Sequence, residues 1–227
     1  MEVPSSAGLR QLFQRSFPFV EVMAEGEGAD RYDCSTYHLS LPLYCASTPE
    51  LWPAPPYLRS APQSVKSWHT RLRRYPGVKV GIIWRTGAES WNSAQRSCPL
   101  SNLLPLTALS GVQLFALQQD VSDQEKATLE QIGIVDLSSA LESWDSTAAC
   151  MTALDGIVSV DTGCLHLAGA LGRPTWALLP AVADWRWGLE ASTLWYPNTR
   201  LGRQLRPGEW GPVVARVAQE LQAVCNP

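Results

Sequence analysis

Residues 158–174 read VSVDTGCLHLAGALGRP, a hydrophobic run followed by Asp-Thr-Gly, a histidine and several small residues. Asp161 and Thr162 are of the types that cap helices, so the backbone N–H groups of Gly163 and Cys164 would be free in the first helical turn. The partial positive charge of a helix N-terminus favours an anion there. The pattern therefore predicts an anion-binding turn between a buried strand and a helix.

His166 extends this expectation, because it follows Thr162 by four residues and so shares a helix face with it. Helical side chains lean toward the N-terminus, which aims the imidazole at a bound group. Gly163 has no Cβ and allows a ligand close to the backbone. Asp-Thr is often only a cap, however, and a lone histidine often only a core residue. Arg85 and Arg96, in the loop after an earlier strand, favour a diphosphate as the ligand.

From residue 79 onward, apolar runs of strand length alternate with helical patterns. This alternation predicts parallel βαβ units and an α/β fold, a doubly wound, Rossmann-like parallel sheet. In the common strand order 3-2-1-4-5, Trp84 and Val160 end adjacent strands, and the loops 85–96 and 161–166 meet at the ligand-binding crevice. Strands are predicted at 79–84, 112–118, 134–137, 156–160 and 175–180, and helices at 100–109, 123–132, 144–154, 162–171 and 209–224.

The first third of the chain is organised differently. Residues 39–62 are rich in proline, which excludes a continuous helix or a central strand and indicates an extended linker between domains. A strand is predicted at 19–25 before this linker, and a short helix at 64–77 after it.

Composition excludes several classes of protein. The 227 residues are 45% hydrophobic and 17% charged, which suits a folded core, and a net charge of -3 with no basic bias argues against a nucleic-acid partner. No apolar run approaches the about 20 residues of a membrane span, and no signal peptide is recognisable, so the prediction is a cytoplasmic protein. The six cysteines form no CxxC pair, so neither a metal site nor a disulfide framework is expected. No GxGxxG or Walker A motif is present, and no cofactor is predicted.

Three segments together resemble the heptosyltransferase-like glycosyltransferases: VSVDTGCLHLAGALGRPTWALLP, DWRW at 184–187 and WYPNTRLGRQ at 195–204. The sequence is most similar to bacterial tetratricopeptide-repeat proteins with an O-GlcNAc-transferase-like C-terminal region. YDCSTYHLSLP, PPYL and KVGIIW also match, and the resemblance covers residues 19–221. It implies a GT-B architecture, in which two Rossmann-like domains enclose the site and the C-terminal one binds a nucleotide-sugar donor.

The resemblance also implies the domain organisation and the site. Residues 62–227 would be the nucleotide-sugar-binding domain, and residues 1–61 a remnant of the acceptor-side domain with its proline-rich linker. The loop WRTGAESWNSAQRS keeps Arg96 and Ser97 but lacks the His and Asp usual in the family. The catalytic base is unknown, with Glu21, Glu25 and Asp33 as weak candidates. The predicted substrate-binding residues are Arg85, Thr86, Gly87, Arg96, Gln118, Asp161, Thr162, Gly163, Cys164, His166, Asp184 and Trp185.

The function implied is that of a glycosyltransferase-type domain that binds a UDP-, ADP- or GDP-linked sugar and transfers the sugar to an unknown acceptor. Because most of the acceptor-side domain is not recognisable, the chain is expected to be incomplete on its own. It would form a homodimer or take its acceptor domain from a partner chain. Two alternatives stay open. One is a non-catalytic nucleotide-sugar-binding or scaffold protein, and the other, less favoured by DWRW and WYPNTR, is a GT-B epimerase.

Overall fold

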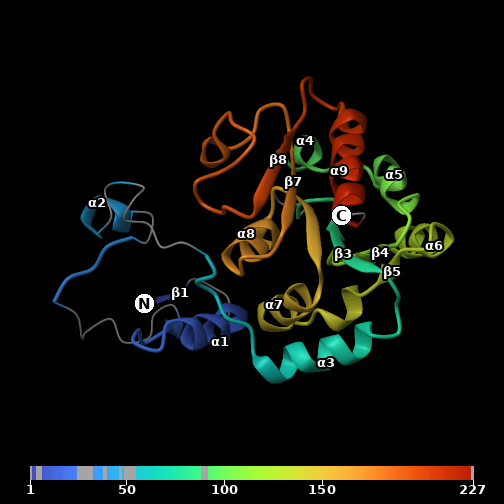
Figure 1. The fold of residues 1–227 in the computed structure, drawn as a ribbon. Helices are drawn as coiled ribbons and strands as arrows, with labels where there is room; N and C mark the ends of the chain where they lie inside the picture. The colour runs from blue at the N-terminus through green and yellow to red at the C-terminus, as the bar shows by residue number, and fades with distance from the viewer. Residues whose placement is uncertain are drawn as a thin grey trace.

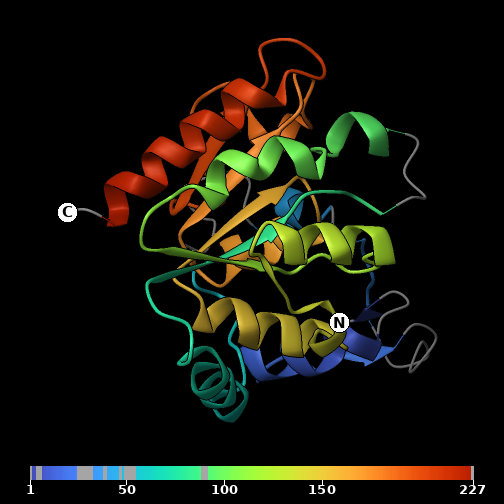
Figure 2. The same ribbon diagram turned by 90° about the vertical axis from the view of Figure 1, so that its right-hand side faces the viewer.

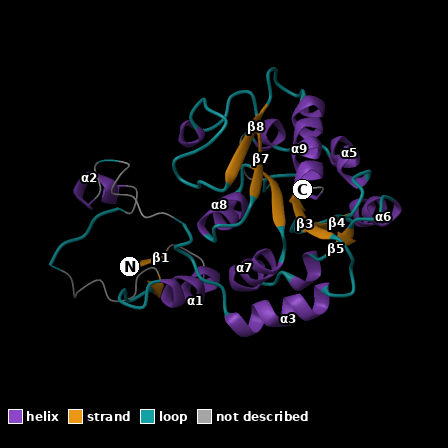
Figure 3. Cartoon of the chain, viewed as in Figure 1, coloured by secondary structure: helices purple, strands orange, loops and turns teal. Residues whose placement is uncertain are grey.

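The computed structural model describes residues 2–3, 7–24, 33–37, 40–45, 48, 55–87 and 92–225. In these ranges six parallel strands form one sheet in the order β5-β4-β3-β6-β7-β8 (Figure 3). The predicted doubly wound α/β sheet is therefore confirmed, with β8 as an additional edge strand. The strands are β3 (Val78–Ile83), β4 (Val112–Ala116), β5 (Val135–Asp136), β6 (Gly156–Val160), β7 (Thr175–Leu179) and β8 (Thr199–Arg203).

Helices cover both faces of this sheet, as Figures 1 and 2 show. On one face α7 (Trp144–Ala153) and α8 (Gly163–Ala170) lie against the strands, with α1 (Ala7–Ser16) and α3 (Pro62–Leu72) outside α7. The opposite face carries α5 (Leu104–Thr107), α6 (Asp123–Gln131) and α9 (Trp210–Cys225). Each face therefore has its own apolar cluster, as a doubly wound sheet requires.

β3 and β6 are neighbours, with Ile83 opposite Ser159. This pairing confirms the prediction that Trp84 and Val160 lie at the ends of adjacent strands. The chain leaves β3 toward helices on one face and leaves β6 toward α8 on the other. The carboxyl ends of these two strands are thus the topological switch point, where open α/β sheets bind ligands.

The helix predicted at 100–109 is divided into a 3₁₀ turn, η3 (Leu100–Leu103), and α5. Pro105 is the second residue of α5, a position where the missing N–H is tolerated. The helix predicted at 64–77 begins earlier, with Pro62 in its first turn, and ends at Leu72.

The N-terminal region contains a helix that the sequence reading missed. α1 carries Leu9, Leu12 and Phe13 at helical spacing, and Leu12 is fully buried against the core that contains α7. Arg15 forms a two-pronged ion pair with Asp145, with nitrogen–oxygen distances of 2.5 and 3.0 Å. The boundary at residues 61 and 62 stays a prediction, but α1 shares the core of the larger domain.

The strand predicted at 19–25 is largely wrong for the described residues. Only β2 (Met23–Ala24) is extended in a ladder, where it pairs with β1 (Glu2–Val3), and Glu25 lies outside the described residues. In the predicted extended linker, α2 (Leu41–Cys45) is a short helix that includes Pro42. Residues 39, 46–47 and 49–54 of this segment lie outside the described residues.

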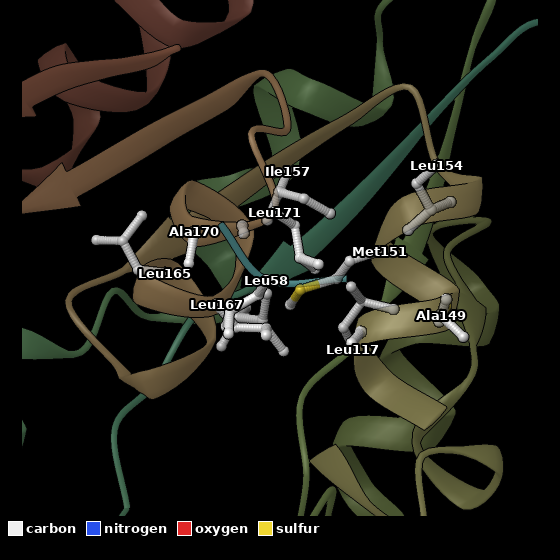
Figure 4. Packing of buried hydrophobic residues seen from close by; sticks show 14 of the residues in the cluster. Leu58, Leu117, Ala149, Met151, Leu154, Ile157, Leu165, Leu167, Ala170 and Leu171 are labelled. Carbon is white, nitrogen blue, oxygen red and sulfur yellow. The ribbon is translucent and has the colours of Figure 1, made fainter. Parts of the chain in front are cut away.

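The core between α7 and α8 fixes the position of α8. Figure 4 shows Met151 of α7 and Leu154, which follows α7, on one side, and Ile157 of β6 with Leu167 and Leu171 on the other. All five belong to one buried cluster. Burying each side chain of this size contributes about 1.5–3 kcal/mol, so the N-terminus of α8 is held firmly at the carboxyl edge of the sheet. No helix within the described residues has the length and apolar character to cross a membrane.

Candidate anion site at the switch point

The first turn of α8 starts at Thr162, whose φ of -140° and ψ of 171° are those of an N-cap residue. The Thr162 side chain makes no capping hydrogen bond. Its hydroxyl instead lies 3.4 Å from the hydroxyl of Ser159. The cap residue therefore leaves the Gly163 and Cys164 N–H groups without a side-chain cap, which is the arrangement that accommodates an anion.

His166 lies one turn into α8 and is held on two sides. Its Nδ1 is 3.0 Å from the Tyr196 hydroxyl, and its ring stacks on Trp187 with centroids 5.1 Å apart and planes 17° apart. A third of the side chain, 33%, stays exposed. Burial lowers the pKa of His166, and Arg186 and Arg96 lower it further against the opposing effect of Asp161 and Asp184. The imidazole is thus neutral at pH 7, with one proton to donate.

Asp161 and Arg96 meet beside this histidine. Asp161 is 3% exposed, its Oδ1 lies 3.8 Å from His166 Nε2 and its Oδ2 lies 3.6 Å from Arg96 Nη2. Arg96 Nη2 also donates to the Asp161 carbonyl, and its buried Nε has no partner among the described residues. Arg96, on α4 (Ser93–Arg96), therefore reaches the turn after β6, where the predicted meeting of the two loops places it.

Arg85 lies at the same edge but is turned toward α6. Its Nε is 3.2 Å from Glu125 Oε1, and its Nη2 donates to the Asp120 carbonyl. The side chain of Gln118 is buried, and its Oε1 accepts hydrogen bonds from the backbone N–H groups of Trp84 and Arg85, at 3.3 and 3.0 Å. Arg85 and Gln118 thus brace the loop after β3, and neither contacts α8 in this structure.

The rest of that loop is described only in part. Thr86 is buried, and its N–H donates to Ser97 Oγ at 3.1 Å. Gly87 is exposed, and a Cβ built there would have no neighbour within 4 Å. Residues 88–91 lie outside the described residues. Thr86 therefore helps to hold the loop in place, whereas a side chain at Gly87 would meet none of the described residues.

The segment between β7 and β8 packs beside His166. Asp184 caps the short turn η5 (Trp185–Trp187) and accepts from the Arg186 N–H at 3.0 Å. Arg186 also pairs with Asp184 through its Nε, at 3.0 Å. Trp187 is buried under the imidazole, but Trp185 is 78% exposed. Of the DWRW segment, Trp187 contacts His166, whereas the predicted contact residue Trp185 faces solvent.

Sequence reasoning missed Trp144, the first residue of α7. A Cβ on Gly163 would lie 2.7 Å from Cη2 of Trp144, and one on Gly8 would lie 3.3 Å from its Cδ1. The indole therefore fills the space beside the first turn of α8 and joins it to α1. Two widely separated glycines were the only sequence signal, and nothing local connects them with a tryptophan.

A hollow of about 600 Å³ opens along the same edge, beyond the ends of β4 and β5. Asp120, which accepts from Arg85, lines it together with Lys126, Asp136 and Ser138. Another hollow, of about 370 Å³, is lined by Asp155, Pro174 and Trp176 at the opposite, amino edge of the sheet. The 600 Å³ hollow therefore lies along the same edge of the sheet as the switch point.

The contribution of Glu125 to the stability of the fold depends on pH. Burial alone would raise the pKa of Glu125, but hydrogen bonds from Ser122, Arg85 and Trp84 outweigh it and lower the pKa to about 2. The carboxylate stabilises the fold fully above its unfolded pKa, and this stabilisation is lost as pH falls from about 4.5 to about 2.

We expect Glu125→Gln to lower the free energy of unfolding by about 1–2 kcal/mol at pH 7, after allowance for partial exposure to solvent. Urea denaturation of both proteins from pH 7 down to the acid limit of folding measures this difference. The difference should shrink toward zero at low pH. A difference that is the same at every pH would contradict the expectation.

The chain is similar to known proteins in both sequence and fold. Residues 90–193 match the sequence model of glycosyltransferase family 9 (heptosyltransferase). The structure resembles ADP-heptose LPS heptosyltransferase II of E. coli with a TM-score of 0.54 and 19% identity, over 78% of this chain and 54% of that one. The fold is therefore that of the heptosyltransferases, and residues 90–193 are similar in sequence to glycosyltransferase family 9.

Two further proteins are similar over part of their length. Protein FlbA of Caulobacter vibrioides is 30% identical over 94% of this chain and 39% of its own length. Anabaena Alr3699/HepE, solved in complex with UDP and glucose, has a TM-score of 0.43 and 14% identity over 74% of this chain and 48% of that one. The chain thus spans well under half of FlbA and about half of the E. coli enzyme.

Proposed function

We propose that this chain is a glycosyltransferase-type domain that binds the diphosphate of a UDP-, ADP- or GDP-linked sugar at the N-terminus of α8. The observation that carries the proposal is the first turn of α8, uncapped by Thr162, with His166 and Arg96 beside it. Backbone donors, an imidazole N–H and a guanidinium supply complementary hydrogen bonds for phosphate oxygens. The family match over residues 90–193 supports a nucleotide sugar as the ligand.

The charges in the site set limits on how the diphosphate binds. Asp161 already balances Arg96, and Asp184 balances Arg186. The attraction for an anion therefore rests mainly on the helix dipole and on hydrogen-bond donors. The nucleoside then extends along the carboxyl edge into the hollow beyond β4 and β5, where Asp136, Ser138 and Lys126 offer polar contacts.

Transfer of the sugar requires more than binding of the donor. An inverting transfer needs a base that accepts the acceptor proton while the site stabilises the departing diphosphate. Glu21 and Asp33 are exposed, Glu25 lies outside the described residues, and no base is assigned. We propose that the 227 residues bind the donor but transfer sugar slowly without an acceptor-side domain, because rate depends on holding both reactants in register.

The second candidate is a non-catalytic nucleotide-sugar-binding protein. It is favoured by the loop after β3, where Arg85 is engaged by Glu125 and the His and Asp usual in the family are absent. Both candidates predict donor binding, but only the first predicts turnover in the presence of an acceptor domain.

Calorimetry with ADP, UDP and GDP tests the shared part of the proposal. We expect at least one diphosphate to bind and the matching free nucleoside to bind at least about 10-fold more weakly, because the nucleoside lacks the groups that α8 would hold. Equal affinity for nucleoside and diphosphate, or binding of neither, would contradict a phosphate site at α8. Measuring the release of the nucleoside diphosphate from the sugar donor, with and without a candidate acceptor domain, then separates the two candidates.

A further inference from the structure

We infer that Tyr196, backed by Tyr57, is a positioning residue that holds the His166 imidazole in the tautomer with its proton on Nε2. This inference deepens the proposed function, since a proton on Nε2 would face the ligand at the α8 turn. The contact between Tyr196 and His166 is observed independently of any ligand.

The ring of Tyr196 packs against α8 at Gly169, one turn beyond His166. A Cβ on Gly169 would lie 2.4 Å from Cγ of Tyr196, so only glycine leaves room for this ring. Tyr196 is 8% exposed, and its hydroxyl reaches His166 Nδ1 at 3.0 Å. The aromatic ring is thus clamped against the helix whose histidine it contacts.

Tyr57 completes the arrangement from a distant segment. Its hydroxyl is hydrogen-bonded to that of Tyr196, and its N–H and that of Leu58 donate to the Ala170 carbonyl at 3.1 and 3.2 Å. Burial raises the pKa of both tyrosines, so both keep their protons at neutral pH. The Asp161 carboxylate, whose Oδ1 lies 3.8 Å from His166 Nε2, favours the imidazole proton on that nitrogen, which leaves Nδ1 to accept from the Tyr196 hydroxyl.

Acceptance at Nδ1 leaves the imidazole proton on Nε2. That nitrogen faces Asp161, with Oδ1 at 3.8 Å, and is the one beside the α8 turn. The stack on Trp187 restrains the ring plane. The other charged groups around the ring are Arg96, Arg186 and Asp184. Tyr196 at Nδ1 and Asp161 beside Nε2 therefore make His166 a hydrogen-bond donor toward the proposed phosphate without adding charge.

Ring-nitrogen NMR of histidine-labelled protein at about pH 8, where histidine is neutral, tests the inference without any ligand. We expect His166 to show a single tautomer, protonated at Nε2, with Nδ1 hydrogen-bonded. Tyr196→Phe should remove the hydrogen-bond shift at Nδ1 or mix the tautomers, and Tyr57→Phe should do so in part. Tyr75→Phe is the matched control, because Tyr75 contacts Phe115 and should leave His166 unchanged.

Two results would overturn the inference: a proton on Nδ1 in the unaltered protein, or His166 nitrogen shifts that stay unchanged in Tyr196→Phe. Phenylalanine still fills the space over Gly169, and Tyr57→Phe provides a second variant should the first not fold. Where a nucleoside diphosphate binds, we expect Tyr196→Phe to weaken binding about 3- to 10-fold. Absence of nucleotide binding in the unaltered protein would refute the proposed function alone, since the tautomer is read separately.

Discussion

Leu12→Ala is expected to lower the free energy of unfolding by about 2–5 kcal/mol, the range for truncating a buried leucine. Leu12 has no exposed surface and belongs to the cluster that includes Ala148 and Met151 of α7. The neighbouring helix α7 is itself packed against the sheet, so the cavity left behind should close only in part. The loss would show that α1 is a cooperative part of the domain.

Urea denaturation monitored by tryptophan fluorescence measures the change. Gln11→Ala is the matched control on the same helix, because Gln11 is exposed and should change stability by no more than about 0.5 kcal/mol. Equal stability of the two variants would mean that α1 does not fold onto this core in solution.

The position of α1 also bears on the site. Trp144 lies between Gly8 of α1 and Gly163 of α8, and the next residue, Asp145, is paired with Arg15. Loosening α1 would therefore free the indole that fills the space beside the α8 turn. Stability at the N-terminal helix and order at the proposed phosphate site are linked through this tryptophan.

The central strands could be predicted because their apolar runs have strand length and are bounded by turn residues. β8 escaped prediction because it is an edge strand in which polar Arg200 and Arg203 occur among buried residues. α1 has an amphipathic helical pattern, with Leu9, Leu12 and Phe13 on one face, although the resemblance implied only a remnant strand and a linker in this region.

Topology predicted which loops meet, but not which side chains face each other. Arg96 and His166 meet at Asp161 as expected, whereas Arg85 is held by Glu125. Glu125 is itself fixed by the capping box that starts α6, a partner choice that sequence spacing does not determine.

Tyr57 and Tyr196 illustrate a second limit of sequence reading. Each occurs in a segment that the resemblance matched, and the segment of Tyr196 was expected to line or brace the donor pocket. Their meeting at His166 depends on the close approach that Gly169 permits and on two hydrogen bonds to Ala170. Contacts between such distant positions follow from the folded core and not from any local pattern.

His166→Ala is expected to weaken the binding of a nucleoside diphosphate sugar by about 1–3 kcal/mol, the range for a lost hydrogen bond to a charged group. The imidazole lies one turn into α8 with a third of its side chain exposed, which leaves Nε2 accessible to a ligand. Because Asp161 already balances Arg96, the site has little spare cationic charge to compensate for a missing donor.

Calorimetry with the variant and with His69→Ala separates this role from a packing role. His69 is exposed on α3, so its replacement should change neither affinity nor stability. His166→Ala removes a ring that stacks on Trp187, so some loss of thermal stability is expected with the loss of affinity. Unchanged affinity in a folded His166→Ala protein would leave the histidine as a packing residue between Trp187 and Tyr196, and the diphosphate would then have to be held by the backbone of α8 and by Arg96.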